Sequence, residues 1–213
     1  MERPVIYYFY DILCGWCYGF SPVIQRFYKE QKEHFDFRVI SGGMVIGERE
    51  GPIGEVAGYI RKAYRDVEEK TGVKFGQAFL DGPLKKGSMQ FTSLPGALAM
   101  ATFRLYQPDN VIPFAARLQK AIYDEGLPPA EAKTFGHCAE DFGMNASDFM
   151  RLMVQKEKLE LVMKEFKLVQ EWGIQGFPAV VYQKEQKGYL ITRGFLNYQQ
   201  LSENFKKVRE EVG

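Results

Sequence analysis

The residues of this chain that could do chemistry begin with two cysteines, Cys14 and Cys17, separated by Gly15 and Trp16. This Cys-Gly-Trp-Cys motif follows an apolar, β-prone run at 5–10 and opens a stretch with helical periodicity. Cysteines at this spacing, at a strand-to-helix junction, are typical of a redox dithiol. The unpaired N–H groups and the positive dipole at a helix N-terminus stabilise a thiolate, so we expect a lowered pKa at Cys14. The spacing also lets Cys17 turn back onto Cys14 and close a short disulfide.

The dithiol interpretation gives each cysteine a role. Cys14 attacks as the nucleophile, and Cys17, more buried on the first helical turn, resolves the mixed disulfide. Two alternatives are a pair of unrelated core cysteines and half of a zinc site. Zinc takes four ligands, and beyond the pair the chain offers only Cys138, His137 and His34. His137 and Cys138 are adjacent in a predicted helix and point about 100° apart, so we predict no metal site.

The elements that must position the motif follow from hydrophobic periodicity. A buried strand at 5–10, a helix at 18–33 and an alternating strand at 35–41 form a β-α-β unit, in which we expect the two strands to be parallel. The elements predicted at the other end of the chain are strands at 179–182 and 188–192, which form a β-hairpin, and a helix at 198–211.

The middle of the chain, from about 52 to 172, has almost no strand pattern. Its candidate helices lie at 53–70, 93–106, 110–125, 130–142 and 146–172, and 72–92 is predicted to form a loop. We therefore predict an α/β fold with two domains. Residues 1–43 and 173–213 form the first, and 44–172 form a helical insertion domain.

Composition restricts the class of protein. The 213 residues suffice for one large domain or for a domain with a sizeable insertion. A net charge of +1 gives no reason to expect nucleic acid or a membrane surface as partner. Residues 1–4 lead directly into a strand without the pattern of a secretory signal. The three cysteines form no disulfide framework, so we expect a reducing, cytoplasmic location.

A second motif, Gly176-Phe177-Pro178, stands just before the predicted strand at 179–182. Proline is tolerated at the first residue of a strand, and an X-Pro bond in a tight turn is a candidate for the cis form. The tripeptide alone is weak evidence for a function. In a chain that also has a Cys-x-x-Cys motif, it is much stronger evidence for a redox site.

The two motifs together resemble the DsbA-type branch of the thioredoxin superfamily. The resemblance rests on Cys-Gly-Trp-Cys followed by Tyr-Gly-Phe-Ser-Pro at 18–22, and on 173–179, which is similar to that family's cis-proline loop. Residues 41–44 and 91–95 resemble segments of a cytosolic subgroup, the FrnE-like oxidoreductases. The implied fold is a thioredoxin fold, β-α-β…β-β-α around a central mixed sheet, with a large all-helical insertion.

The resemblance implies a protein thiol–disulfide oxidoreductase or isomerase. Pro178 would be cis and pack beside the two cysteines, and the backbone of Phe177, after Gly176, would pair with an extended substrate segment. Trp16 would tune the redox potential and cover one side of the site. No cofactor is implied beyond the Cys14–Cys17 disulfide. The partners would be client proteins with thiols or disulfides, and glutathione is a candidate co-substrate.

One position departs from the family pattern. Many relatives carry a buried acid six residues before the first cysteine, as a proton acceptor, and this chain has Tyr8 there. Asp11 is the nearest acid, but its side chain can equally form a turn hydrogen bond, so we assign it no catalytic role. Cys138 is interpreted as a buried, small hydrophobic residue, with a regulatory thiol as the alternative.

Two other functions stay open. Kappa-class glutathione transferases and 2-hydroxychromene-2-carboxylate isomerases also insert helices into a thioredoxin fold. Those enzymes typically carry serine at the position of Cys14 and need no second cysteine, so the intact motif argues against this alternative. The other is a non-catalytic DsbA-like adaptor that delivers clients to a protease, with the insertion as its docking surface.

Overall fold

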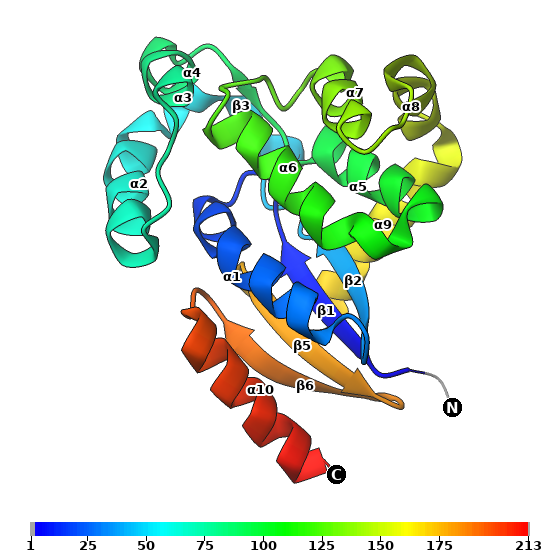
Figure 1. Cartoon of the computed structure of the whole chain (residues 1–213). Coiled ribbons are helices and arrows are strands. Elements are labelled where there is room, and N and C mark those ends of the chain that lie inside the picture. Colours follow the sequence, from blue (N-terminus) through cyan, green and yellow to red (C-terminus); the bar gives the residue numbers. More distant parts are fainter. Residues whose placement is uncertain (1–2, 213) are drawn as a thin grey trace.

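A four-stranded mixed sheet carries the cysteine motif (Figure 1). In the computed structural model, which describes residues 3–212, the strand order is β2-β1-β5-β6. The central strand β1 (Val5–Tyr10) runs parallel to β2 (Asp36–Ser41) and antiparallel to β5 (Ala179–Lys184). β5 pairs antiparallel with β6 (Lys187–Arg193). The predicted parallel pair, the hairpin and the mixed sheet are therefore confirmed.

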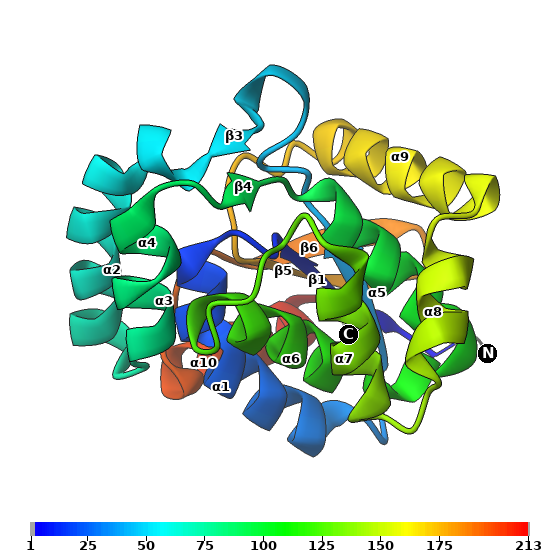
Figure 2. The ribbon, with the colours of Figure 1, turned by 90° about the horizontal axis from the view of Figure 1, so that it is seen from above.

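Helices cover both faces of the sheet, which explains why β1 is apolar throughout. α1 (Gly15–Gln31) and α10 (Tyr198–Val212) lie on one face, and α9 (Lys156–Glu171) lies on the other (Figures 1 and 2). Successive side chains of β1 point to opposite faces of the sheet. The Tyr8 ring lies 6.0 Å from that of Phe20 on α1, whereas Tyr7 lies 5.0 Å from Trp172, just after α9.

The predicted insertion is helical apart from one two-residue ladder between β3 (Gly51–Pro52) and β4 (Gln90–Phe91). Its remaining α-helices are α2 (Ala57–Thr71), α3 (Gln77–Asp81), α4 (Pro83–Lys86), α5 (Leu94–Tyr106), α6 (Val111–Tyr123), α7 (Ala132–Glu140) and α8 (Ala146–Met153). One buried cluster runs from the sheet through α1 into this region. The division into domains 1–43 with 173–213 and 44–172 stays a prediction.

Three boundaries differ from those expected. α1 begins at Gly15 and not at 18, so the motif itself forms the first helical turn. The helix expected at 146–172 is interrupted, because Gln155 adopts an extended backbone conformation before α9. The loop expected at 72–92 is wrong, since α3, α4 and β4 lie there. Their formation depends on burial of Phe79 and Leu84 in the tertiary structure, which local pattern does not show.

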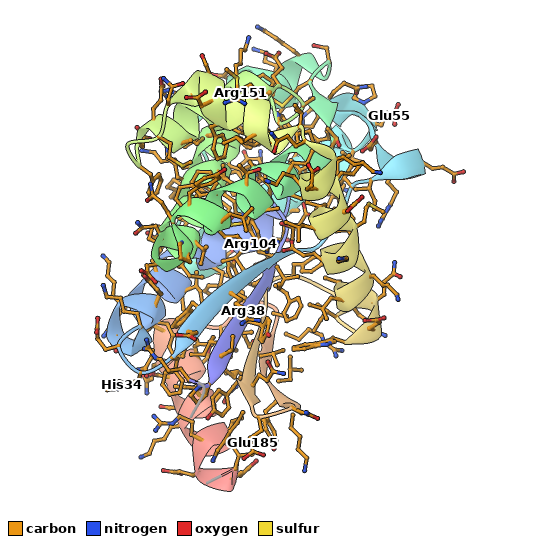
Figure 3. The ribbon with its side chains drawn as sticks, turned by 90° about the vertical axis from the view of Figure 1, so that its right-hand side faces the viewer. His34, Arg38, Glu55, Arg104, Arg151 and Glu185 are labelled. Atoms are coloured by element: carbon orange, nitrogen blue, oxygen red, sulfur yellow. The ribbon has the colours of Figure 1, made fainter. Side chains whose placement is uncertain are left out.

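Two residues of the predicted insertion form an ion pair with each other, and both also hydrogen-bond to the edge strand β2. Figure 3 shows this side, with Arg104 of α5 above Arg38 of β2. Arg104 pairs with Glu165 of α9, whose side chain is 6% exposed. Glu165 Oε2 accepts a hydrogen bond from the Ser41 N–H at 3.0 Å, and Arg104 Nη1 donates to the Val39 carbonyl at 3.4 Å. These bonds fix the end of β2 next to the cysteine motif.

Candidate active site

Cys14 is the N-cap residue of α1. Its backbone is extended (φ −86°, ψ 107°), and its Sγ accepts a hydrogen bond from the Cys17 N–H at 3.2 Å. The Cys14 side chain therefore occupies the place that a serine or aspartate takes at other helix N-termini. A negative charge on this sulfur would face unpaired N–H groups and the positive end of the helix dipole. Cys14 and Cys17 are both free thiols in this structure.

Cys17 lies behind Cys14, on the inner side of the first turn of α1. Cys14 is 6% exposed and Cys17 is fully buried. Burial, and to a smaller extent the hydrogen bond with Cys14, raise the pKa of the Cys17 thiol well above its usual value. The two sulfurs thus differ in access and in chemistry, and only Cys14 is placed to meet an outside disulfide.

The Gly-Phe-Pro loop lies against Cys14. The Phe177–Pro178 peptide bond is cis, as the family resemblance implies. The Cys14 thiol donates to the Phe177 carbonyl oxygen at 3.5 Å, across 163 residues of sequence. The Phe177 ring also packs onto Gly42, where an added Cβ would lie 2.2 Å from Phe177 Cζ. Two loops far apart in the sequence therefore meet beside Cys14.

Asp11 ties the loop before Cys14 to its neighbours. Its carboxylate accepts hydrogen bonds from the Leu13 N–H at 2.9 Å, the Met44 N–H at 2.8 Å and the Ser93 hydroxyl at 2.8 Å. Burial raises the pKa of the Asp11 carboxyl, and these three bonds oppose the rise. The Leu13 contact confirms the expected turn hydrogen bond. The other two give Asp11 a positioning role that the sequence did not indicate.

Two residues of α6 also hold this loop, and sequence reasoning missed both. Gln119 Nε2 donates to the carbonyls of Asp11 at 3.1 Å and Cys14 at 3.3 Å. The Tyr123 hydroxyl donates to the Leu13 carbonyl at 2.5 Å. The one available signal was Gln119 itself, a polar residue within the apolar face of a predicted helix. Because such bonds satisfy buried carbonyls, α6 helps to hold the loop that leads to Cys14.

A cavity of about 520 Å³ opens at Cys14. Trp16, Gly176 and Phe177 line it together with Cys14, whereas Cys17 and Pro178 are buried behind its wall. Tyr59, Tyr64 and Val67 of α2 form the opposite wall. Arg49 alone carries a charge among the described residues of the lining. The Trp16 ring lies 6.3 Å from that of Phe195, with the two ring planes tilted by 39°.

The remaining candidates lie away from this cavity. Cys138 is fully buried on α7, and burial raises the pKa of its thiol to about 12, which agrees with its interpretation as a core residue. His137 is exposed and lies 3.5 Å from Glu140. Within residues 3–212, no three His, Cys, Asp or Glu side chains gather where they could bind one metal ion. In the same range, no helix combines the length and hydrophobicity that a membrane crossing requires.

The chain is similar to known proteins in sequence and in fold. A family model described as thioredoxin matches residues 7–203. A solved structure described as a "putative protein disulfide isomerase" from Nitrosomonas europaea superposes with a TM-score of 0.85 at 26% identity, over 100% of both chains. No curated protein matches the chain.

Two further solved structures share the fold. The cytosolic disulfide reductase DsbM from Pseudomonas aeruginosa has a TM-score of 0.82 at 24% identity, over 98% of this chain and 100% of its own. That protein has also been solved with GSH. A 2-hydroxychromene-2-carboxylate isomerase has a TM-score of 0.62 at 12% identity, over 98% of this chain and 95% of its own. At these identities the likeness shows the fold alone.

Proposed function

The chain belongs to the thioredoxin family and has a DsbA-like fold, and we propose that it is a protein thiol–disulfide oxidoreductase or isomerase. One observation carries the proposal. The Cys14 sulfur caps α1, receives the Cys17 N–H, touches the carbonyl of Phe177 and opens to a cavity. A nucleophilic sulfur, a second sulfur on the same turn and a peptide-binding loop are the parts that disulfide exchange requires.

The reaction proceeds in two exchanges. The Cys14 thiolate attacks one sulfur of a client disulfide, a Cys14–client bond forms, and the other client sulfur leaves as a thiolate that takes up a proton. Cys17 then attacks the Cys14 sulfur, which forms the Cys14–Cys17 disulfide and releases the second client thiol. Two electrons pass from the protein to the client, and an external thiol must restore the dithiol.

The loop at 176–178 supplies the client site in this proposal. Gly176 and Phe177 line the cavity beside Cys14, and a client segment in an extended conformation can pair with their backbone. Pro178, which is buried, follows Phe177 in this loop. Trp16 lines the same cavity and would contact the client there.

Glutathione is the thiol that we propose for restoring the dithiol. The cavity of about 520 Å³ accepts a molecule of tripeptide size. Its charged residue, Arg49, is placed to attract a carboxylate. The GSH complex of the DsbM neighbour supports the same assignment. A cytoplasmic location, where glutathione keeps thiols reduced, belongs to this proposal.

Single-cysteine variants test the function. Cys14→Ala is expected to abolish reduction of insulin by glutathione, because no nucleophile remains. Cys17→Ala is expected to accumulate mixed disulfides between Cys14 and insulin, detected by mass spectrometry after acid quenching. Turnover by Cys17→Ala at the wild-type rate would refute the two-cysteine mechanism. Glutathione-conjugating activity that survives Cys17→Ser would instead favour the transferase–isomerase alternative.

A further inference from the structure

The outer edge of β2, which faces away from β1, borders a cavity of about 1050 Å³. Figure 3 looks onto this edge, with α9 in yellow beside it. On the side of α1, the cavity is lined by Tyr28 and by Pro108, which precedes α6. On the other side it is lined by Leu161, Lys164 and Leu168 of α9. This cavity is a second concave site, and neither cysteine of the motif lines it.

The backbone of β2 turns every second residue toward this cavity. The N–H groups of Asp36 and Gly42 donate to carbonyls of the chain that forms β1, at Pro4 and Tyr10. The even-numbered residues of β2 therefore pair with β1. The odd-numbered residues direct their N–H and C=O groups outward.

Three of these outward groups have no hydrogen-bond partner. At one end of the edge, Arg104 donates to the Val39 carbonyl. Glu165 accepts a bond from the Ser41 N–H, so side chains already cover that end. The N–H and carbonyl of Phe37 and the N–H of Val39 bond to no group within residues 3–212. An edge strand with unpaired groups is a template for an added strand.

Basic side chains lie on the face of the sheet that α9 covers. Arg38 Nη1 donates to the Tyr7 hydroxyl at 3.3 Å, and the guanidinium carbon lies 5.8 Å from the centre of that ring. Tyr7 contacts Trp172, just after α9, so Arg38 is on the α9 side. Arg38 and Lys164 both line the cavity, and neither forms an ion pair within the part of the chain that the structure describes. This side of the cavity therefore carries two positive charges that no acid neutralises.

The acidic side chains of the lining are either paired or on the opposite side. Asp36 lies 3.5 Å from Arg3. Glu165 is held by the ion pair to α5. The other charged residues of the lining, on the side of α1, are Lys32, Glu33 and Asp109. Charge is therefore segregated across the edge, with unpaired bases on the α9 side and acids mostly on the α1 side.

The side chains of β2 on the α1 side are apolar. The Phe37 ring lies 5.0 Å from that of Tyr28, and Val39 points to the same face as Phe37. The side chains of a strand added to this edge would alternate between the apolar side and the basic side. The complementary segment therefore alternates apolar and acidic residues.

We propose that the outer edge of β2 binds an extended polypeptide segment in which acidic and apolar residues alternate. The segment adds a fifth strand to the sheet, its backbone pairs with the free groups of Phe37 and Val39, and its acidic side chains contact Arg38 and Lys164. A second copy of this chain would bring the same two walls beside its own β2, so a single segment fits the cavity better than another sheet edge. The site does not depend on the proposed function, because it contains neither Cys14 nor Cys17.

A short fluorescein-labelled peptide of alternating glutamate and valine tests the proposal by fluorescence anisotropy. One control peptide carries lysine in place of glutamate. A second keeps the glutamates and replaces the valines by proline, so it retains the charge but cannot pair as a strand. We expect binding of the first peptide alone. Equal affinity for the lysine peptide or the proline peptide would overturn the proposal, as would no binding of the first.

Two charge reversals locate the binding site. Loss of an exposed ion pair weakens binding about two- to fivefold, and repulsion adds a similar factor. We therefore expect Arg38→Glu and Lys164→Glu each to weaken binding about 5- to 25-fold. Lys167→Glu is the matched control, because Lys167 is also exposed on α9 but pairs with Glu171 and does not line the cavity. Equal affinities in Lys164→Glu and Lys167→Glu would refute the assigned site.

Amide hydrogen exchange measured by NMR tests strand addition directly. The N–H groups of Phe37 and Val39 should exchange more slowly when the peptide is bound, and unchanged exchange at both would overturn the added strand. Sedimentation equilibrium tests the other occupant: a dimer that forms without peptide and that Arg38→Glu dissociates would show that a second copy takes this edge. Cys14→Ala should bind the peptide as the wild type does, so failure of the proposed function would leave this result intact.

Discussion

Gly42→Ala tests whether the reactivity proposed for Cys14 depends on the packing of the cis-proline loop. Gly42 follows β2, and its N–H donates to the Tyr10 carbonyl at 2.8 Å. An added Cβ would lie 2.2 Å from Phe177 Cζ and 2.6–2.7 Å from its Cε atoms. The φ angle of Gly42 is not positive, so alanine fits the backbone and the conflict is with the ring alone. Phe177 must move, and its carbonyl is the group that contacts the Cys14 sulfur.

The expected change in the free energy of unfolding of Gly42→Ala is the difference between two opposing effects. Overpacking of a buried contact costs about 1–3 kcal/mol. Replacing glycine by alanine restricts the unfolded chain and returns about 0.4–1 kcal/mol. The net loss in the free energy of unfolding is then about 1–2 kcal/mol, which for a chain of this size lowers Tm by roughly 2–8 °C. Because both cysteines stay intact, we expect kcat/KM for insulin reduction to fall mainly through a higher KM.

Urea unfolding and steady-state insulin reduction measure these effects. Gly58→Ala is the matched control, because Gly58 is the second residue of α2 and no atom lies within 4 Å of its added Cβ. Adding Phe177→Leu to Gly42→Ala should restore much of the lost stability, since the smaller side chain relieves the contact. Equal stability and equal KM in Gly42→Ala and Gly58→Ala would refute the reasoning.

Three further substitutions test other parts of the structure. Tyr10→Phe removes a buried hydroxyl that has no partner among the described residues, so the free energy of unfolding should rise by about 1–3 kcal/mol; a lower Tm would contradict this. Arg104→Met leaves Glu165 buried without its cation and should cost about 2–4 kcal/mol in urea unfolding, below the full value for a buried pair, because Arg104 is 23% exposed; an unchanged midpoint would show that the pair is not stabilising. Burial raises the pKa of the Cys138 thiol from 9.0 to about 12, so between these values the folded state binds more protons and stability falls as pH rises, by at most about 1.4 kcal/mol per pH unit. Cys138→Ala should flatten that slope in urea titrations from pH 8 to 10.5, and an unchanged slope would argue against a buried thiol.

The parts of the site that could be predicted from the sequence are local. The Cys-Gly-Trp-Cys motif and the Gly-Phe-Pro tripeptide are each continuous, and the elements that carry them show clear periodicity. The supporting bonds are not local. Gln119 reaches the Asp11 carbonyl across 108 residues, and Ser93 reaches its carboxylate across 82. Hydrophobic periodicity does not predict such pairings between distant residues. The contact between Gly42 and Phe177 could not be predicted from the sequence for the same reason.

The pattern of these long-range bonds also bears on the adaptor alternative. An adaptor whose insertion binds clients under redox control needs the insertion to respond to the state of the two sulfurs. In this structure Gln119 and Tyr123 bond to backbone carbonyls of the loop, at Asp11, Leu13 and Cys14, and neither bonds to a sulfur. The Cys14 sulfur bonds to the Cys17 N–H and the Phe177 carbonyl, so these are the contacts that a Cys14–Cys17 disulfide would alter first. The redox change would then act at the cavity beside Phe177, where we propose that a client binds, and this arrangement favours the proposed catalyst over a redox-controlled adaptor.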